Sequence, residues 1–371
     1  MEFSITKKSL LDCLSHFQSV VERRNTIPIL SNLKISAVEG GLSLTATDLA
    51  LELSESLTAN VTATGGITIP SQLFFEIIRK APDSSQISLK QDDKSGSVIV
   101  FFGKSKFSLP TLPVEDFPVM DSDNLDAELT LLATDLKMLI NNSKFCMGLD
   151  ESRQYLNGIF LHTNGEFILA VATDGHRLVK YEKNNEKTGD FGDIIVPKKF
   201  LNLMVGGLNE GTIKLSVGET HLTTNVGGDQ YFTRIIDESF PDFDGVIPKD
   251  NDKNLIVDKQ TLLSAVKRVS IFSNKSTHQI ALNLNNENVL VSTEDPEQST
   301  KAKENIKGDY SGDDIVVGYN ATYLKDVLSH VDDNKVVVQL KSPISAALFL
   351  PNKQKDNTSL TMLLMPIRLN D

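Results

Sequence analysis

The stretch Ala172-Thr173-Asp174-Gly175-His176-Arg177-Leu178 joins two short segments of strand type. The residues before it, 167–171, are apolar, and the residues after it, 179–182, alternate between apolar and polar. An Asp-Gly pair between two such segments is a strong signal for a β-hairpin, because both turn residues tolerate a positive φ angle. The stretch therefore predicts a hairpin turn, and it becomes more informative because the chain repeats it.

Two further segments resemble this hairpin. Leu42–Asp48 matches Ile168–Asp174, and Val289–Asp295 is a weaker third copy. The aspartates that end the three segments are spaced by 126 and 121 residues. A regular spacing of this length indicates a repeated domain rather than a short solenoid unit.

An amphipathic helix is predicted before each hairpin, because apolar residues recur at the spacing i, i+4, i+7. From Leu10 to Leu136 and from Leu136 to Leu262 the distance is 126 residues in both cases. The three apolar stripes are Leu10, Leu14 and Phe17; Leu132, Leu136 and Leu139; and Leu262, Val266 and Val269.

After each hairpin, a strand is predicted to lead into a second helix. The three strands are Ile67–Pro70, Ile194–Pro197 and Ile315–Gly318, and their ends are 127 and 121 residues apart. A proline is tolerated at a strand end or just before a helix, because its missing N–H costs little there.

These three sets of matching segments predict three tandem domains of one α+β fold, at residues 1–124, 125–250 and 251–371. Each domain should contain two helices packed on antiparallel sheets, since hairpins connect its strands. Polar, turn-rich segments at 121–124 and 248–252 mark the boundaries.

The composition is that of a soluble globular protein, with 40% hydrophobic and 23% charged residues among 371. The N-terminal residues lack the order of charged and apolar segments that a signal peptide has. Cys13 and Cys146 have no metal-ligand or CxxC spacing, so we expect two small core residues and a reducing, cytoplasmic environment. The sequence predicts no metal site and no cofactor.

Motifs for catalysis are scarce, since the sequence has no GxGxxG segment, P-loop, HExxH segment or GxSxG elbow. Asp174 and His176 could act as an orienting carboxylate and a base, but no readable serine or cysteine nucleophile accompanies them. A hydrolase built on this pair remains an alternative, and the sequence itself favours a protein with no catalytic residues.

The formal net charge of -12 argues against a protein that binds nucleic acid with its whole surface. Basic residues gather on or beside the six predicted helices, whereas acidic residues lie mostly elsewhere. A solvated helix face would also explain these basic residues, but the repeats favour a basic inner lining around an acidic body. The basic residues are Lys7, Lys8, Arg23, Arg24, Lys137, Lys144, Lys198, Lys199, Lys259, Lys267 and Arg268.

Together with the triplicated domain, five segments resemble the bacterial DNA polymerase III beta subunit family, the DNA sliding clamps. The resemblance covers the whole chain in order. The segments are Pro28–Leu33, Arg153–Gly158, Ala172–Leu178, Ser239–Phe243 and Leu363–Leu369.

The resemblance implies a head-to-tail homodimer in which six domains form a ring, with helices around the hole and sheets outside. Duplex DNA would pass through the hole, and the ring would tether the replicative polymerase without any catalysis of its own. A clamp loader would open and close the ring. A topological link of this kind raises the effective concentration of polymerase at DNA without a strong DNA contact.

The family has a pocket for short linear peptides of its partners, and the matching positions form a candidate site here. An apolar floor would supply contact area, and Arg and His groups would fix the peptide register. The candidate residues are Arg153, Leu156, Thr173, Gly175, His176, Arg177, Leu178, Pro241, Val246, Ile344, Leu363, Met365, Pro366, Ile367, Arg368 and Leu369.

The resemblance also implies DNA contacts and a dimer seam. Asp150 and Gln154 differ from residues found in relatives, so we expect a thinner basic lining, and Asn370-Asp371 extends beyond the usual end. The candidate DNA contacts are Arg24, Tyr155, Lys198 and Lys199, and the candidate seam residues are Phe107, Leu109, Ile271 and Phe272. The main alternative is a monomeric three-domain scaffold that binds peptides and never meets DNA.

Overall fold

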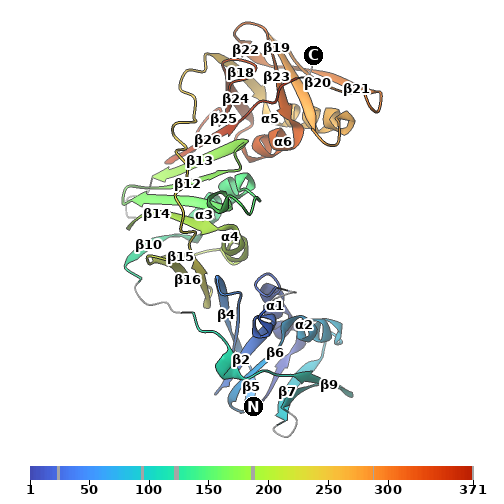
Figure 1. Cartoon of the computed structure of the whole chain (residues 1–371), viewed down its shortest axis with the longest axis vertical. Coiled ribbons are helices and arrows are strands. Elements are labelled where there is room, and N and C mark those ends of the chain that lie inside the picture. Colours follow the sequence, from blue (N-terminus) through green and yellow to red (C-terminus); the bar gives the residue numbers. More distant parts are fainter. Residues whose placement is uncertain (23–25, 93–95, 121–124, 185–188, 287, 370–371) are drawn as a thin grey trace. The chain divides into compact units, whose positions relative to one another are not determined.

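The computed structural model describes residues 1–22, 26–92, 96–120, 125–184, 189–286 and 288–369. Within this part of the chain, every strand pairing is antiparallel, and the helices lie against the sheets (Figure 1). The predicted α+β class is therefore confirmed. Among the described residues, no helix is both long and apolar enough to cross a membrane.

The chain folds into two compact units. The first contains Met1–Leu136 and Lys199–Ile235, and the second contains Lys137–Lys198 and Ile236–Asp371. The divisions fall within helix α3 (Ala133–Ser143) and after the first residue of helix α4 (Lys198–Val205).

The first unit contains a five-stranded sheet in the order β5-β1-β7-β8-β9 and an eight-stranded sheet in the order β10-β15-β16-β17-β4-β3-β2-β6. Helices α1 and α2 contact each other. The bounds are β1 Glu2–Thr6, α1 Lys7–Phe17, β2 Asn32–Val38, β3 Gly41–Thr47, β4 Leu51–Thr58, β5 Asn60–Ala63, β6 Gly65–Pro70, α2 Ser71–Lys80, β7 Gln86–Asp92, β8 Ser97–Phe102, β9 Ser105–Pro110, β10 Ala127–Leu132, β15 Thr212–Val217, β16 His221–Val226 and β17 Asp229–Arg234.

The second unit contains a nine-stranded sheet in the order β14-β11-β12-β13-β26-β25-β24-β18-β22 and a four-stranded sheet in the order β21-β20-β19-β23. Helices α5 and α6 contact each other. The bounds are β11 Gly158–Asn164, β12 Phe167–Thr173, β13 Arg177–Asn184, β14 Asp190–Pro197, β18 Lys253–Asp258, α5 Lys259–Val269, β19 Gln279–Asn285, β20 Asn288–Asp295, β21 Thr300–Lys307, β22 Asp309–Ser311, β23 Ile315–Asn320, α6 Ala321–His330, β24 Lys335–Leu340, β25 Ala347–Pro351 and β26 Thr358–Leu364.

Short 3-10 helices complete the described structure. Their bounds are Pro28–Ser31, Val114–Asp116, Lys144–Cys146, Gln154–Leu156 and Ser270–Phe272.

The two largest sheets each join strands from two of the sequence repeats. Strand β4 of the first repeat pairs with β17 of the second, and Leu53 lies opposite Tyr231. Strand β13 of the second repeat pairs with β26 of the third, and Leu178 lies opposite Leu363. The corresponding strands that remain, β21 of the third repeat and β9 of the first, each lie at the edge of a sheet.

The helices bury the predicted stripes, with one exception. Leu10, Leu14 and Phe17 are fully buried on α1, and Leu262, Val266 and Val269 are buried on α5. The expectation for Leu132 was wrong. This residue ends strand β10 and is 54% exposed, because the helix begins only at residue 133 and its buried stripe is completed by Ile140 instead.

Side-chain caps fix where three of the helices begin. Thr6 accepts a hydrogen bond from the backbone N–H of Ser9, and Asp258 accepts one from Thr261. Asn320 caps α6 in the same way. Each cap satisfies an N–H group that has no partner within the helix.

A lysine links the helix pair in two of the repeats. Lys7 at the start of α1 donates to the carbonyl of Ala81, at 2.6 Å, just after α2 ends. Lys259 at the start of α5 donates to the carbonyl of Val331, at 2.8 Å, just after α6 ends. A cation at these positions also interacts favourably with the negative end of the helix dipole, at the C-terminus of the second helix.

A carboxylate pair lies at the β4–β17 junction. His16 of α1 hydrogen-bonds the buried Glu55 of β4 at 2.7 Å. Asp229 of β17 is next in register to Glu55, and burial, followed by the charge of Glu55, raises the pKa of Asp229 to about 6. The hydrogen bond to Glu55 likewise raises the pKa of His16.

The raised pKa of Asp229 predicts a pH-dependent stability of the first unit. The fold disfavours the ionised form of Asp229. The contribution of protonated Asp229 to the free energy of unfolding is therefore fully present below the pKa of this group in the unfolded chain, and it is lost as the pH rises through about 6. A shift of about two units corresponds to about 3 kcal/mol, which solvent screening of this partly exposed group reduces to about 1 kcal/mol. We therefore expect Asp229→Asn to stabilise the unit by about 1 kcal/mol at pH 8 and to have little effect at pH 4, close to the pKa of an unfolded aspartate.

Urea denaturation at the two pH values measures this difference. The exposed Asp126 of the same unit provides the control substitution Asp126→Asn, for which we expect no such pattern. An equal effect of Asp229→Asn at both pH values would contradict the assignment.

Candidate functional site

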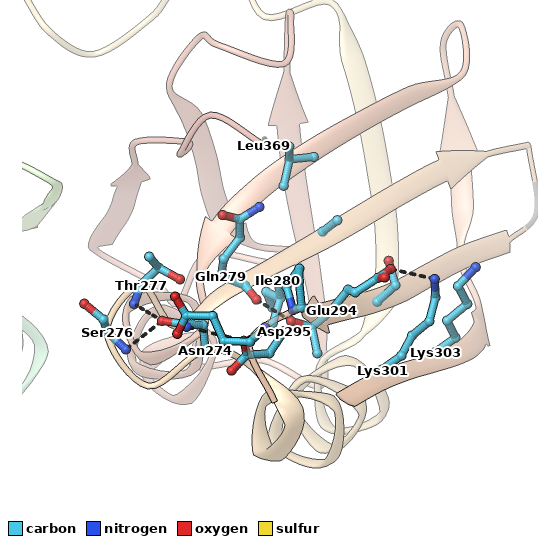
Figure 2. A pocket seen from close by; sticks show the side chains of 15 residues that line it. Asn274, Ser276, Thr277, Gln279, Ile280, Glu294, Asp295, Lys301, Lys303 and Leu369 are labelled. Atoms are coloured by element: carbon cyan, nitrogen blue, oxygen red, sulfur yellow. Dashed lines mark hydrogen bonds and ion pairs between the residues drawn. The ribbon is translucent and has the colours of Figure 1, made fainter. Parts of the chain in front are cut away.

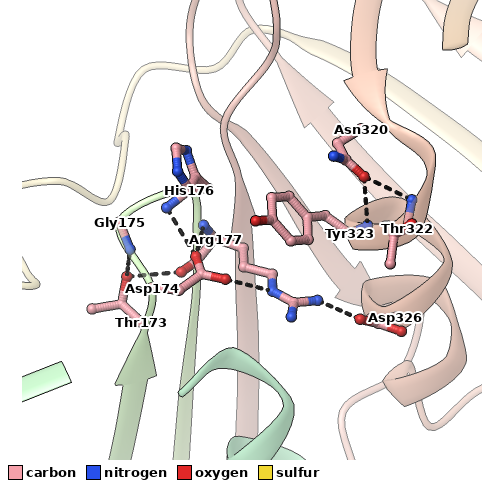
Figure 3. Close-up of polar contacts among 9 residues, drawn as sticks. All are labelled: Thr173, Asp174, Gly175, His176, Arg177, Asn320, Thr322, Tyr323 and Asp326. Carbon is pink, nitrogen blue, oxygen red and sulfur yellow. Dashed lines mark hydrogen bonds and ion pairs between the residues drawn. The ribbon is translucent and has the colours of Figure 1, made fainter. Parts of the chain in front are cut away.

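The Asp174-Gly175 turn joins β12 to β13 as predicted (Figure 3). Asp174 Oδ1 accepts the backbone N–H groups of His176 and Arg177, at 2.9 and 3.0 Å. Thr173 Oγ1 donates to the carbonyl of Arg177 at 2.7 Å and accepts the N–H of Gly175 at 3.1 Å. The turn is thus held by two side chains that bind its own backbone.

Gly175 has a φ of 87°, a conformation that costs glycine little. Leu49 occupies the corresponding position of the first repeat with a φ of 74°. A leucine is strained in this region. The first repeat therefore keeps the backbone geometry of the turn without the glycine.

Arg177 is 8% exposed and lies between charged and aromatic groups. Its Nε donates to Asp174 Oδ2 at 3.1 Å, and a terminal nitrogen donates to Asp326 Oδ2 of α6 at 2.6 Å (Figure 3). Its guanidinium lies 4.5 Å from the ring centre of Tyr323 and 5.5 Å from that of Phe145. Arg177 thereby joins a strand of the second repeat to a helix of the third, within one compact unit.

His176 is exposed, and its ring stacks against Tyr323 with a centroid distance of 5.9 Å. Asp174 binds the backbone N–H of His176, while its second oxygen binds Arg177. The carboxylate is therefore used to hold the turn, and this geometry does not favour the hydrolase alternative, which requires Asp174 to orient the imidazole.

The C-terminal segment lies against this turn. The backbone N–H of Met365 donates to the carbonyl of His176 at 2.8 Å. Two residues on, Ile367 forms a bridge with Gly318 of β23, with an N–O distance of 2.9 Å. The hydrogen bond between Met365 and His176 thus places the C-terminal segment beside the Asp174 turn, although the two lie about 190 residues apart in sequence.

A second apolar surface completes the site. Leu178 and Leu363 are buried together in a cluster with Phe160, and we call this group the linker cluster because the segment 236–247 covers it. Phe240 of that segment stacks on Phe160 with a centroid distance of 5.0 Å, and the ring of Phe243 lies tilted against Phe160 at 5.7 Å. The linker segment is thus fixed by aromatic contacts next to the turn.

Apolar side chains at the edges of the linker cluster remain exposed. Ile344 is 70% exposed, and Val246 and Met365 are about half exposed. The neighbouring Ile247 and Ala346 pack against the cluster. Exposed apolar residues beside a rigid apolar floor are typical of a binding surface.

Arg153 lies at the rim, because a Cβ atom on Gly175 would approach its terminal nitrogen to 3.3 Å. Asp150 holds this arginine through a bond to Nε of 2.9 Å. The hydroxyl and backbone N–H of Ser152, followed by Arg153, lower the pKa of Asp150 to about 2. The negative charge of Asp150 is therefore balanced locally.

The candidate DNA contacts occupy different surroundings. Tyr155 packs against the linker cluster. Lys199 binds the Asp48 carboxylate and the carbonyl of Val20, and Lys198 begins α4. Arg24 lies outside the described residues, as does the Asn370-Asp371 extension.

The candidate seam residues differ in exposure. Phe107 stacks on Phe102 at the β8–β9 hairpin, with a centroid distance of 5.2 Å, and Leu109 is buried in the core. Ile271 and Phe272 are exposed at the end of α5.

The sequence did not lead us to Tyr323, Asp326 and Phe145, which contact Arg177. Tyr323 and Asp326 are three residues apart on α6 and so lie on the same helix face. That spacing was readable in the sequence, but nothing in it identified Arg177, 149 positions away, as the partner of Asp326.

Comparisons with known proteins agree with this architecture along the entire chain. Family models for the N-terminal, central and C-terminal domains of the DNA polymerase III beta subunit match residues 1–121, 130–242 and 244–368. The beta sliding clamp of Caulobacter vibrioides is 35% identical, and that of Escherichia coli is 31% identical. Each alignment covers 100% of both chains.

The chain belongs to the DNA polymerase III beta subunit family.

Solved structures of beta subunits resemble the fold equally closely. The sliding clamp of Bartonella birtlesii bound to griselimycin superimposes with a TM-score of 0.92 at 32% identity. The Caulobacter crescentus beta sliding clamp with bound polyethylene glycol gives a TM-score of 0.92 at 35% identity. Both comparisons cover 100% of each chain. The three repeats are therefore clamp domains of a beta subunit.

Proposed function

We propose that this protein is a DNA sliding clamp that encircles duplex DNA as a dimer and tethers the replicative polymerase and other DNA-processing proteins. The observation that carries the proposal is the full-length similarity to beta sliding clamps, in which all three domains match in order. The clamp domains lie at residues 1–124, 125–250 and 251–371. It acts in the cytoplasm as an accessory subunit and has no catalytic activity of its own.

The strand pairings support a head-to-tail dimer. Strands β4 and β13 each pair with the last strand of the next repeat, whereas β21 and β9 lie at sheet edges. Pairing of β21 with β9 of a second copy extends the same rule. Because two such seams form between two chains, the contact closes into a ring of six domains.

The repeat also gives the register of this seam. Leu51 pairs with Thr233 at the β4–β17 junction. When the third hairpin is superimposed on the first so that Asp295 matches Asp48, Thr300 occupies the position of Leu51. When the β8–β9 hairpin is superimposed on the β16–β17 hairpin, Leu109 occupies the position of Thr233. Thr300 of one copy therefore lies opposite Leu109 of the other, close to Phe107, Ile271 and Phe272.

We propose that the helix side of the ring meets DNA through Arg24, Tyr155, Lys198 and Lys199. The net charge of -12 fits a weak, sliding contact rather than a tight grip. Lys199 is already bound to Asp48, so its attraction for phosphate is reduced.

The peptide site is proposed around the Asp174 turn, the linker cluster and residues 363–369. Partner peptides, including those of the polymerase and the clamp loader, would bury apolar side chains against Val246, Ile344 and Met365. His176 and Arg153 would hold the peptide backbone. Arg177 acts as the support beneath this surface, since both of its carboxylate partners belong to the protein.

His176→Ala should weaken peptide binding without unfolding the protein. We expect the dissociation constant of a labelled clamp-binding peptide from a replicative polymerase to rise about tenfold, because one contact of about 1.4 kcal/mol is lost. Fluorescence anisotropy measures the change. Lys353→Ala, at an exposed position outside the site, is the control. Unchanged affinity in His176→Ala would remove His176 from the site.

The clamp function itself is tested by topology. The protein is loaded onto nicked circular DNA by a bacterial clamp loader with ATP, and the DNA is then cut once. We expect the protein to stay on the circle and to leave the linear product within minutes. Equal retention on linear DNA would mean that the protein binds DNA directly rather than encircling it.

A further inference from the structure

The aspartate that ends each repeated hairpin has a different set of partners in each repeat. Asp48 Oδ1 accepts hydrogen bonds from the backbone N–H groups of Ala50 and Leu51. Its Oδ2 accepts a hydrogen bond from the ammonium group of Lys199. Lys199 is the second residue of α4, the second helix of the next repeat. The first turn is therefore tied to the following repeat by an ion pair.

The second turn is tied to the following repeat by a longer connection. Asp174 Oδ1 accepts two backbone N–H groups, and Oδ2 binds Arg177, which binds Asp326. Asp326 is on α6, which is again the second helix of the next repeat. At both junctions, a polar group on that helix thus completes the turn.

The third turn lacks this completion. Asp295 is 1% exposed, and its Oδ1 accepts the backbone N–H of Glu297 at 3.1 Å and the amide of Asn274 at 3.5 Å. Its Oδ2 is buried and has no hydrogen-bond partner among the described residues. A buried carboxylate oxygen without a donor is destabilising, so a donor that reaches Asp295 in the assembled protein would stabilise the third turn.

A cavity of about 1000 Å³ opens beside Asp295 (Figure 2). Asn274 and Thr277 line it at one end and Lys301 and Lys303 at the other. It therefore lies next to β21, the strand edge for which the proposed dimer supplies a partner.

Apolar exposure near the cavity and on α2 follows the same pattern. Phe272 is 43% exposed, whereas the corresponding residues Val20 and Cys146 are fully buried in the other two repeats. On α2, Leu73 is half exposed, whereas the corresponding Phe200 of α4 is buried. Phe272, near the third turn, and Leu73, on the second helix of the first repeat, are thus both exposed at positions where the corresponding residues of other repeats are buried.

We infer that Asp295 is completed by Gln72 of a second copy, whose side-chain amide donates to the orphaned Oδ2. Gln72 is the second residue of α2 and so corresponds to Lys199, the residue that binds Asp48. It is exposed in this chain. Leu73 of the second copy covers Phe272 beside this bond.

This inference rests on the proposed ring and adds to it one specific pair. Here a neutral amide replaces the ammonium found at the first junction. A hydrogen bond from an amide to a carboxylate is shorter-ranged than an ion pair and needs closer alignment. Of the three junctions, only the first has an opposite charge, Lys199, at the second position of the following helix; the second junction has Thr322 there and the intermolecular junction has Gln72.

The test is a charge-exchange series measured by sedimentation equilibrium of the full-length protein over a dilution series. Gln72→Glu places a second carboxylate against Asp295 at both seams, and we expect the dimer dissociation constant to rise at least 100-fold. Gln72→Lys restores the ion pair of the first junction and should lower that constant about tenfold. In the double variant Gln72→Glu with Asp295→Asn, an amide again faces a carboxylate, and the constant should return to within about tenfold of the original.

Gln86 on β7 is an exposed glutamine of the same repeat, so Gln86→Glu and Gln86→Lys control for the change in net charge. Dimers that tolerate Gln72→Glu, or that Asp295→Asn does not rescue, would overturn the pairing while leaving the ring intact. A wild-type protein that stays monomeric at micromolar concentration would instead overturn the ring on which the pairing rests. Circular dichroism of each variant separates loss of folding from loss of the seam.

Discussion

Replacing Arg177 with alanine should destabilise the β13–β26 junction by about 3 kcal/mol, the largest effect we expect from one substitution within a compact unit. The substitution removes a buried cation from two carboxylates, of Asp174 and Asp326, and from two aromatic rings. Asp174 is then left with a carboxylate oxygen in a largely buried position. Because Asp326 is about two-fifths exposed, water compensates part of the loss on that side.

Native-state hydrogen exchange of the amides in β13 and β26 measures this effect locally, which suits a protein of several domains that need not unfold in one step. A double-mutant cycle with Asp326→Asn separates the Arg177–Asp326 bond from the other contacts. His176→Ala is the neighbouring control, and it should leave exchange unchanged. If Arg177→Ala also leaves exchange unchanged, the arginine does not hold this junction.

Replacing Phe272 with aspartate should dissociate the dimer. Covering the exposed part of the phenylalanine ring contributes about 1 kcal/mol, and burying an unpaired carboxylate costs about 2 kcal/mol more. Since a head-to-tail ring of two chains contains two identical seams, the cost of about 3 kcal/mol counts twice. The dimer dissociation constant should therefore rise by roughly four orders of magnitude.

Sedimentation velocity at micromolar and nanomolar concentrations measures this change directly. Leu149→Asp is the matched control, because Leu149 is an exposed apolar residue that lies outside the proposed seam. We expect the control to remain dimeric. Dimers of Phe272→Asp that persist at nanomolar concentration would exclude Phe272 from the seam.

The architecture could be predicted from sequence because the repeated signals are local. A hairpin turn needs only the few residues around Asp174, and a helix stripe needs only residues within about two turns. Where the prediction was wrong, at Leu132, a strand of alternating burial ran directly into the helix, and its last apolar residue happened to extend the helical spacing.

The surroundings of the candidate site could be predicted only in part. The family resemblance selected Ala172–Leu178 and Leu363–Leu369, and the structure joins the two through the Met365–His176 hydrogen bond. It could not show that the Arg177 side chain turns toward α6, because that direction depends on Tyr323 and Asp326. Side-chain direction at a junction is decided by tertiary contacts, which neither spacing nor composition records.

The different partners of the three turn aspartates have a consequence for how the chain avoids misfolding. Three similar strand edges, β4, β13 and β21, must each choose among three similar partners, and repeated domains are prone to exchange them during folding. If β4 paired with β26, Asp48 would lie next to Thr322 at the place where α4 supplies Lys199, and its largely buried carboxylate would lose its cation. The junctions are thus distinguishable by their polar groups even though their backbones are alike, so a wrongly paired intermediate is less stable than the native one and can rearrange.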